Sequence, residues 1–569
     1  MSTYKRNSHH LTVAALIAVL LSSPLAMAAT YTVGGDGADY ANLEALRLSS
    51  VLRDGDTIIL NGNDNSLTAS FANSFTLQGS GVISPANSNL RFLNNTSKTI
   101  TLNSDSVEFK DFRSTGAIYG NGVTLSGGTN TFTDNTATYG GAIYSLSTTA
   151  INGGINTFTG NQSTGVSSGG AIYSSGTITI SGGTNTFSNN TATYTGGAIQ
   201  SSSVTINGGT NIFSENTAIA GGAISGSTVT LSGGVNTFAS NSTSSNGNGG
   251  AIFGSSGDVT LSGGTITFTG NLARSAGLGG AIYASGNLTL RASDGDFTFQ
   301  GNQDRVGGSS QKANAIHVAG TTFTLAAEGG QSIYFYDPVT TTTSTSRTIS
   351  INPLATDTGR VIFDGSDYTR DVDRHSAVYG DTTVGNGMLG LKGNAVYGAA
   401  SNVGTFTLGQ NATLATDSTT NRIQANTITL NGLVGVLNGG TLELAASAGT
   451  SINGTVSLGL GMDSFGALSA IGDLTFGNNA SVSFYWDDSY ASLYDGWTQD
   501  YVMSDLFSAT GTMTGLGNLS FNASSFDNSV FDYSWNGNIL TLTYNVPEPA
   551  TLAVLGLGLA GLALSRRRK

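Results

Sequence analysis

The middle of the chain repeats two short motifs at a nearly constant spacing. Gly-Gly-Ala-Ile begins at Gly140, Gly169, Gly196, Gly221, Gly249 and Gly279. Phe-x-x-Asn alternates with it, at Phe132/Asn135, Phe158/Asn161, Phe187/Asn190, Phe213/Asn216, Phe238/Asn241, Phe268/Asn271 and Phe299/Asn302. A segment as short as one repeat cannot bury an apolar face by itself, but stacked copies can. The repeat therefore predicts a solenoid in which each copy forms one coil.

Each repeat contains three short segments with the composition of β-strands. They have the forms Ala-Ile-Tyr-Ser, Val-Thr-Leu-Ser and Asn-Thr-Phe, each bounded by Gly, Ser or Asn. Apolar residues alternate with Thr or Ser, so Leu125, Phe132 and Ile143 are expected to face one way. We therefore predict an all-β fold, a right-handed parallel β-helix in which equivalent strands pair from coil to coil. The motif Asn is expected to turn inward at a corner. A porin-type or lipocalin-type barrel has longer strands and fits poorly.

The paired motifs resemble the repeat of the chlamydial-type polymorphic outer-membrane proteins. The resemblance extends from Phe92 to Ile316 and includes degenerate copies of the motifs at both ends. It implies a surface-exposed β-helix with a role in adhesion. Proteins of that family end in a large translocating β-barrel, whereas only the short segment 481–545 precedes the C-terminal segment here. Self-transport through such a barrel is therefore in doubt.

The C-terminal end has three parts in a fixed order. Pro547, Glu548 and Pro549 precede an apolar run, 550–564, and the chain ends in a basic group formed by Arg566, Arg567, Arg568 and Lys569. The run is slightly shorter than the roughly 17 to 25 residues of a stable membrane helix. The pattern resembles the PEP-CTERM sorting signal of Gram-negative bacteria, which implies recognition by an exosortase at the inner membrane. An ordinary tail anchor with a single membrane segment is the alternative.

The N-terminal end has the form of a secretory signal peptide. Lys5 and Arg6 precede an apolar run, 11–21, and the small residues Ala26 and Ala28 follow it. Signal peptidase is expected to cleave after Ala28. We therefore expect an exported protein of a Gram-negative bacterium. It would be held transiently in the inner membrane and then placed on the envelope surface or in the extracellular matrix.

These features divide the chain into six parts. They are a signal peptide (1–28), an N-terminal cap with first coils (29–110), the repeat β-helix (111–320), irregular coils of the same solenoid (321–480), a C-terminal β cap (481–546) and the sorting signal (547–569). The stretch 42–52 has apolar residues at helical spacing. A short helix there would cover the open end of the β-helix.

Charge and composition exclude several classes of function. The formal net charge of −13 falls to about −19 without the six basic residues of the two ends, so nucleic acid is not expected as a partner. The stretch 114–290 has only four charged residues, Asp134, Glu215, Asp258 and Arg274, and Cys is absent. We therefore predict no catalytic residue, no cofactor and no metal site.

One alternative places a polysaccharide-active enzyme, a lyase or a glycosidase, in residues 321–480. Such chemistry needs converging carboxylates or a base beside Lys or Arg. The candidate residues are Asp357, Arg360, Asp364, Asp371, Asp373 and Arg374. His317 and His375 are the two histidines that follow the signal peptide. The enzyme hypothesis requires the six charged residues to lie in one groove.

The favoured function is that of an adhesin or a structural protein of the envelope. The segment between a motif Asn and the next Gly-Gly varies in length from four to seven residues, and insertions in a solenoid gather on one side. The three long corners are 162–168, 242–248 and 272–278, and Arg274 is their single charged residue. We expect this uncharged edge to carry any contact with a glycan or a surface protein.

Overall fold

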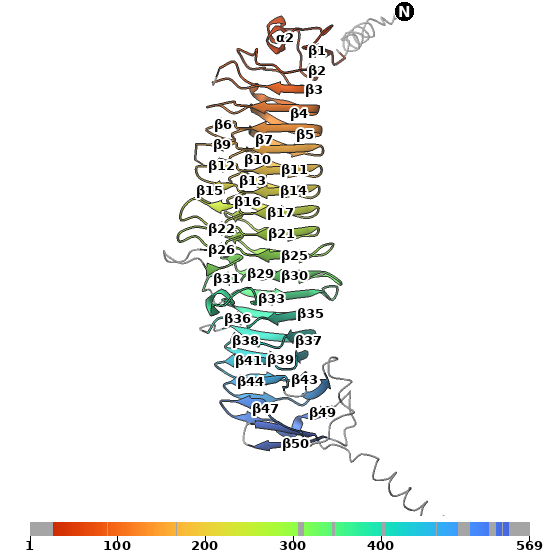
Figure 1. The fold of residues 1–569 in the computed structure, drawn as a ribbon, viewed down its shortest axis with the longest axis vertical. Coiled ribbons are helices and arrows are strands. Elements are labelled where there is room, and N and C mark those ends of the chain that lie inside the picture. The colour runs from red at the N-terminus through yellow and green to blue at the C-terminus, as the bar shows by residue number, and fades with distance from the viewer. Residues whose placement is uncertain are drawn as a thin grey trace, which may run out of the picture.

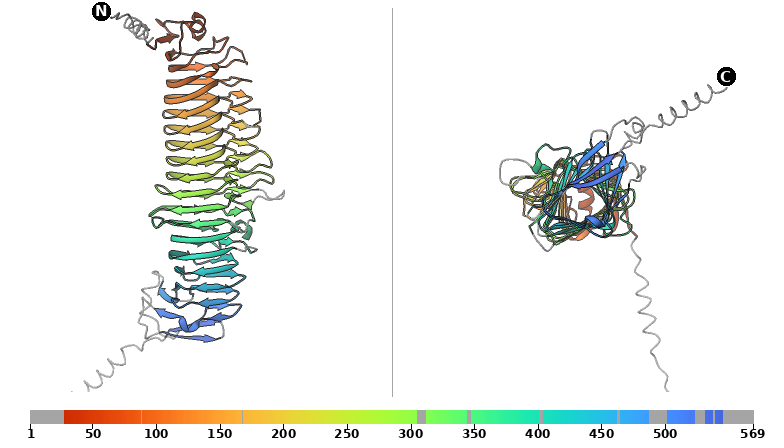
Figure 2. Two further views of the ribbon diagram at one scale, coloured as in Figure 1. Left: turned by 180° about the vertical axis from the view of Figure 1, so that it is seen from behind. Right: turned by 90° about the horizontal axis from the view of Figure 1, so that it is seen from below.

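The computed structural model describes residues 27–87, 89–166, 168–304, 312–343, 347–400, 404–461, 464–486, 501–522, 531–536 and 539–544. Successive coils stack along one axis into a long rod (Figures 1 and 2). Equivalent strands pair in parallel, with Ile143 beside Ile172 and Phe158 beside Phe187. The predicted parallel β-helix is confirmed.

The N-terminal coils contain a helix and long strands. Their elements are β1 (Thr30–Val33), α2 (Leu43–Ser49), β2 (Asp56–Asn61), β3 (Phe75–Ile83), β4 (Leu93–Lys110) and β5 (Ile118–Thr133). The helix lies where the sequence predicts one. The Asn42 side chain caps it by accepting a hydrogen bond from Ala45 N at 2.8 Å. Leu43 and Leu46 are buried against the first coils, so the helix covers the apolar end of the solenoid.

The regular coils follow. Their elements are β6 (Thr136–Ala137), β7 (Ile143–Ile151), β8 (Ile155–Thr159), β9 (Gln162–Ser163), β10 (Ile172–Ile180), β11 (Thr184–Ser188), β12 (Thr191–Ala192), β13 (Ile199–Ile206), β14 (Thr210–Ser214), β15 (Thr217–Ala218), β16 (Ile224–Leu231), β17 (Val235–Ala239), β18 (Ser242–Thr243), β19 (Ile252–Gly254), β20 (Val259–Ser262), β21 (Thr265–Thr269), β22 (Leu272–Ala273), β23 (Ile282–Ala284), β24 (Leu288–Ala292), β25 (Phe297–Gln300), β26 (Gln303–Asp304) and β27 (Lys312–Ala313).

The strand content of a coil differs from the prediction in two ways. The first two predicted strands form one continuous bent strand in β7, β10, β13 and β16, and β5 joins all three. Within the regular coils the two are separate at β19/β20 and β23/β24. The predicted corner after the motif Asn begins with a strand of two residues, such as β12. These short strands form a sheet of their own, at the left edge of Figure 1. They are too short for a period of two to be visible in the sequence.

The later coils continue the stack with less regular spacing. Their elements are β28 (Ile316–Val318), β29 (Thr322–Ala327), β30 (Ser332–Phe335), β31 (Val339–Thr341), β32 (Thr348–Ile351), β33 (Arg360–Asp364), η1 (Asp371–Asp373), β34 (His375–Ser376), β35 (Asp381–Lys392), β36 (Val396–Gly398), β37 (Thr405–Thr416), β38 (Thr420–Ala425), β39 (Thr427–Leu430), β40 (Leu433–Val436), β41 (Thr441–Ala446), β42 (Thr450–Ile452), β43 (Thr455–Leu460), β44 (Ala467–Ile471), β45 (Leu474–Phe476), β46 (Ser481–Trp486), β47 (Tyr501–Ala509), β48 (Met513–Thr514), η3 (Leu516–Asn518), β49 (Ser520–Asn522), β50 (Phe531–Asn536) and β51 (Ile539–Tyr544). The last strands, β47, β51 and β50, pair antiparallel and end the parallel stack.

A continuous ladder of phenylalanine rings runs through the core. Its members are Phe109, Phe132, Phe158, Phe187, Phe213, Phe238, Phe268, Phe299, Phe335 and Phe363, with ring centroids 4.7–5.0 Å apart and planes within 18° of parallel. The spacing of the rings follows the separation of paired strands, which is about 4.8 Å. The motif Phe and the motif Ile are both buried, as the period of two predicts.

The motif asparagines form a second ladder at the corner that follows the Phe strand. It consists of Asn135, Asn161, Asn190, Asn216, Asn241, Asn271 and Asn302, and each Nδ2 donates to the Oδ1 of the next over 2.9–3.0 Å. The inward corner position predicted for these residues is confirmed. A third ladder, which the sequence analysis did not predict, consists of Asn130, Asn156, Asn185, Asn211 and Asn236.

The paired glycines of the repeat lie where no side chain fits. Gly140 has φ 53°, a conformation that residues with a Cβ avoid. A Cβ at Gly141 would collide with the carbonyl oxygen of Gly170 in the next coil. The two glycines therefore make the corner tight enough for the coils to stack, and they have a structural role.

Candidate functional site

The edge predicted to bind a partner is built by the short corner strands. The long corners begin with β9, β18 and β22, which pair with the short strands of the neighbouring coils. The remaining residues of each corner extend beyond this sheet, and Val166 in the first long corner is 56% exposed. The long corners therefore lie on the same edge of the rod, as the sequence analysis expected.

Tyrosine side chains gather beside this edge in the first regular coils. Tyr119, Tyr144 and Tyr173 follow the motif Ile and face outward, with ring centroids 4.6 Å apart for the first pair and 5.2 Å for the second. Tyr139, from a short corner, lies 5.5 Å from the Tyr144 ring. The Arg91 guanidinium lies over the Tyr119 ring at 4.5 Å. Tyrosine and arginine in this arrangement are typical of contact surfaces.

A polar cluster interrupts the buried structure at the last degenerate repeat. Asn314 occupies the position of a motif Gly, and its Nδ2 donates to Asp304 and, at 3.0 Å, to Thr340 Oγ1. His317 Nδ1 lies 2.9 Å from the same hydroxyl oxygen. Burial raises the pKa of Asp304 to about 6 and lowers the pKa of His317 to about 4. Among the described residues, no group of three or more His, Cys, Asp or Glu side chains is placed to hold a metal ion.

Of the six charged residues that the enzyme hypothesis requires to converge, Asp357 and Arg360 lie apart from the others, and Asp371 lies beside Arg374. Asp357 is buried and pairs with Arg291, whose Nη1 lies 2.6 Å from Asp357 Oδ1. Arg360 Nε donates to Ser332 Oγ at 3.2 Å. Asp371 is exposed to solvent, with Arg374 Nη1 at 3.6 Å.

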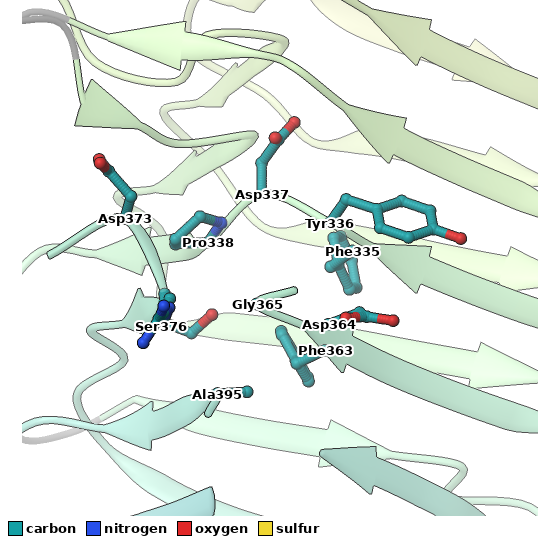
Figure 3. A pocket seen from close by; sticks show the side chains of 11 residues that line it. Phe335, Tyr336, Asp337, Pro338, Phe363, Asp364, Gly365, Asp373, Ser376 and Ala395 are labelled. Carbon is teal, nitrogen blue, oxygen red and sulfur yellow. The ribbon is translucent and has the colours of Figure 1, made fainter. Parts of the chain in front are cut away.

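The other three residues, Asp364, Asp373 and Arg374, line a common cavity, together with Asp337 (Figure 3). Its volume is about 10 Å³, which is room for about one water molecule. The carboxylates of Asp337, Asp364 and Asp373 point in different directions (Figure 3). Asp373 accepts from Arg370 Nε at 2.5 Å and from the Ala313 backbone N–H at 2.9 Å. The cavity is too small for a sugar, and its lining carboxylates form part of the packing.

A larger polar groove of about 410 Å³ lies on the outer face of β36, β38 and β41. Its carboxylates are paired with arginines, because Arg422 Nε donates to Glu443 Oε2 at 2.6 Å and Asp371 lies near Arg374. The His375 ring also lines the groove. Its Nε2 lies 2.6 Å from Gly398 O, and burial lowers its pKa. The groove could bind a polar ligand, but it has no pair of unpaired carboxylates for acid–base chemistry.

The predicted export and sorting residues lie mostly outside the described residues. This holds for Ala26, for Pro547, Glu548 and Pro549, and for the basic group, Arg566, Arg567, Arg568 and Lys569. Ala28 is described and exposed, just before β1. No helix among the described residues is long and apolar enough to cross a membrane.

Comparison with known proteins identifies two families in different parts of the chain. Residues 545–569 match the PEP-CTERM protein-sorting motif. Residues 131–146, 157–175, 186–202 and 265–285 match the Chlamydia polymorphic membrane protein repeat. Both resemblances noted in the sequence are therefore confirmed. No solved structure matches the chain.

Several curated relatives share part of the repeat. The chain is 32% identical over 128 residues to the probable outer membrane protein pmp2 of Chlamydia pneumoniae, which covers 20% of this chain and 15% of pmp2. It is 53% identical over 58 residues to probable outer membrane protein pmp6 of the same species, covering 10% and 4%. It is 46% identical over 56 residues to probable outer membrane protein PmpH of Chlamydia trachomatis, covering 10% and 6%. The matched segments thus span at most 15% of the length of these three relatives.

The tyrosine cluster and the Asn185 ladder are features that sequence reasoning missed. An Asn two residues before the motif Phe recurs in five successive coils, and a period of two places it on the buried face with that Phe. The tyrosines follow the motif Ile, which a period of two places outside. Both signals were present in the repeat itself.

Proposed function

We propose that the protein is an exported β-solenoid of the cell surface or extracellular matrix, that an exosortase processes it, and that it acts as an adhesin or a structural envelope protein. The observation that carries this proposal is the combination of a PEP-CTERM motif at 545–569 with polymorphic membrane protein repeats on a rigid rod. Signal peptidase and exosortase are the maturation partners, and the inner membrane is a transient location.

The proposal excludes enzymatic activity. The relatives are named as outer membrane proteins. The candidate carboxylates of residues 321–480 are divided between a cavity of about 10 Å³ and ion pairs with arginine, and the one that lines the larger groove, Asp371, lies beside Arg374. A glycosidase or lyase would need these groups together beside a sugar-sized cleft.

The contact surface that we propose is the edge with the long corners and the neighbouring tyrosines. Its hydroxyl and amide groups suit many weak hydrogen bonds, and Tyr144 and its neighbours offer aromatic contact area. A glycan or another surface protein is the partner that this chemistry fits.

Processing is tested by replacing the sorting motif. A chain with Pro547, Glu548 and Pro549 all changed to Ala should remain unprocessed in the inner membrane, because Pro-Glu-Pro is rigid and lacks two backbone N–H groups. The control changes Asn545 and Val546 to Ala and leaves Pro547, Glu548 and Pro549 intact. Mass spectrometry of the mature protein determines whether the C-terminal segment has been removed. Normal maturation of the first variant would exclude exosortase processing.

Adhesion is tested by shortening the three long corners to the Thr-Ala-Thr-Tyr form of residues 136–139. The short form retains a strand of two residues, β6, so the corner sheet should stay paired and the rod should fold. Attachment of cells to surfaces or to polysaccharide should fall. Unchanged attachment would remove this edge as the binding face while leaving the processing result untouched.

A further inference from the structure

One face of the regular coils presents a continuous array of mostly β-branched side chains. It consists of the outward residues of the second half of β5 and of β8, β11, β14, β17 and β21, and we call it the threonine face. Its members are Thr129, Thr131, Thr133, Ile155, Thr157, Thr159, Thr184, Thr186, Ser188, Thr210, Ile212, Ser214, Val235, Thr237, Ala239, Thr265, Thr267 and Thr269. Two thirds of these are Thr, and no charged, aromatic or amide side chain interrupts them.

The face is a regular two-dimensional lattice. All five residues of each strand pair in unbroken register with the next strand, without a bulge, from β5 to β21. Outward side chains therefore repeat about every 4.8 Å along the rod and about every 6.7 Å along a strand. Three parallel columns of side chains result. The strands labelled β11, β14, β17 and β21 show this stack (Figure 1).

The side chains of the threonine face are stiff, and each is partly or fully exposed to solvent. All of them except Ser188, Ser214 and Ala239 are Thr, Ile or Val, whose branched Cβ restricts χ1. Ile155 is 54% exposed and Val235 is 46% exposed. Within the described chain, the one side-chain hydrogen bond on this face joins Thr159 Oγ1 and Ser188 Oγ at 3.0 Å. Methyl and hydroxyl groups are thus held at fixed lattice points.

The chemistry of the face excludes the common partners. Nucleic acid and anionic surfaces require basic side chains, and the face has none. Sugar-binding sites use aromatic rings, amides and carboxylates, which the face also lacks. Five steps of about 4.8 Å by five residues give an area of about 400 Å². A stable protein interface needs about 800 Å² per partner, so a second copy of the chain or another globular protein would be held too weakly here.

We propose that the threonine face binds ice. Ice is an uncharged lattice of water molecules, and its prism planes repeat at spacings close to both spacings of the face. Hydroxyl groups at these points can replace lattice waters, and the methyl groups between them restrict the adjoining water. The stiff side chains need little ordering on binding. This function is additional to adhesion through the corner edge, and neither depends on the other.

The test uses the purified mature chain in ice-affinity partitioning, where a slowly growing ice surface excludes ordinary proteins. The wild type should be enriched in the ice several-fold over an inert protein of similar mass, and it should slow ice recrystallisation. The double variant Thr186→Lys/Thr237→Lys places two charges at the centre of the face and should lower the enrichment to that of the inert protein. The control Thr205→Lys lies outward on β13, on another face, and should behave as the wild type.

Thermal melts of both variants establish that the rod remains folded, and a second pair, Thr157→Lys/Thr267→Lys, replaces the first if it does not. A wild type that enters ice no more than the inert protein would overturn the proposal. So would a folded double variant with undiminished enrichment. A third outcome would also overturn the proposal. If the wild type has no affinity for ice but binds insoluble cellulose or chitin, and the double variant does not bind them, the face would be assigned to a crystalline polysaccharide instead.

Discussion

Replacement of one ladder asparagine, Asn190→Ala, should destabilise the solenoid locally. The hydrogen bonds that are lost determine by how much the local free energy of unfolding falls. Asn190 Oδ1 accepts from Asn161 N and from Asn161 Nδ2, both at 3.0 Å. Asn190 Nδ2 donates to Phe158 O at 2.9 Å and to Asn216 Oδ1 at 3.0 Å. Alanine leaves two buried donors of Asn161 without these acceptors. At about 1–3 kcal/mol for each orphaned group, the coil should lose about 2–6 kcal/mol.

A companion variant, Asn190→Asp, separates hydrogen-bond direction from side-chain volume. Aspartate has the shape of asparagine and can accept both bonds from Asn161, but at neutral pH it has no proton to donate to Asn216 Oδ1. The cost should therefore be at least as large as that of the alanine variant, because a buried carboxylate would face an acceptor oxygen. The control, Thr186→Ala, lies outward in the same coil and should change stability by less than about 1 kcal/mol.

Hydrogen exchange measured by mass spectrometry suits this comparison, because a long solenoid does not unfold as a single two-state unit. Coils in a stack contact only their neighbours, so the lost protection should concentrate in peptides that contain Asn161, Asn190 and Asn216. Peptides from β38 to β43 should exchange as in the wild type. Equal effects of Asn190→Ala and Thr186→Ala, or an even loss along the whole rod, would refute the ladder's role in stability.

Three further predictions concern other positions. Phe187→Ala should cost the same coil about 3–5 kcal/mol as a buried large-to-small change; an exchange pattern like that of the wild type would show that the ring ladder does not stabilise the coil. The pKa of Asp304 is raised, so this residue stabilises the folded state below the ordinary carboxyl pKa, and the stabilisation is lost as pH rises through about 6. The pKa of His317 is lowered, so this residue stabilises the folded state above the ordinary imidazole pKa, and the stabilisation is lost as pH falls through about 4. The two effects oppose each other, so the local free energy of unfolding of the wild type should change little with pH between these two pKa values. It should rise with pH in Asp304→Asn, where His317 remains, and fall with pH in His317→Gln, where Asp304 remains. Parallel pH profiles for the two variants would contradict the assignment. Ala29 N donates to Asp56 Oδ1 at 2.7 Å, and cleavage after Ala28 would make this nitrogen an ammonium; Asp56→Asn should then weaken the first coil more in the cleaved chain than in the uncleaved chain, and equal losses would disprove the pairing.

The sequence predicts those parts of the fold that recur in every coil. The Phe187 ring and the Asn190 corner recur at fixed positions in the repeat, so a period of two within each strand places them inside. The Asn185 ladder obeys the same rule, but asparagine is more often a turn residue, so the pattern alone does not predict its burial. The sequence predicts a break between two strands at the bend within β10, because Ser175 and Gly176 form a turn signal there, but the strand turns without breaking.

The candidate site was harder to predict, because its parts come from different coils. Tyr139 lies in one coil and Tyr173 in the next, and only the stacking of the coils brings their rings to 5.6 Å. Sequence reasoning identified the edge on which the long corners lie, since each corner has the same place in its repeat. It did not identify the pairing of Asp357 with Arg291, because 66 residues separate them in the chain.

The charged residues that follow the repeat have a structural explanation in the end of the asparagine ladder. The last member, Asn302, has a backbone N–H and an Nδ2 that need an acceptor in the next coil, where no motif Asn follows. Asp337 supplies it, because its Oδ2 accepts from both groups at 2.8 Å, and its Oδ1 accepts from Gly301 N and from the Tyr368 hydroxyl. A carboxylate suits this position better than an amide, since all four partners donate. The same need for acceptors accounts for Asp373, which receives the Ala313 N–H. Acidic residues that suggest a catalytic site in the sequence thus accept hydrogen bonds from N–H groups that have no acceptor within the regular coils.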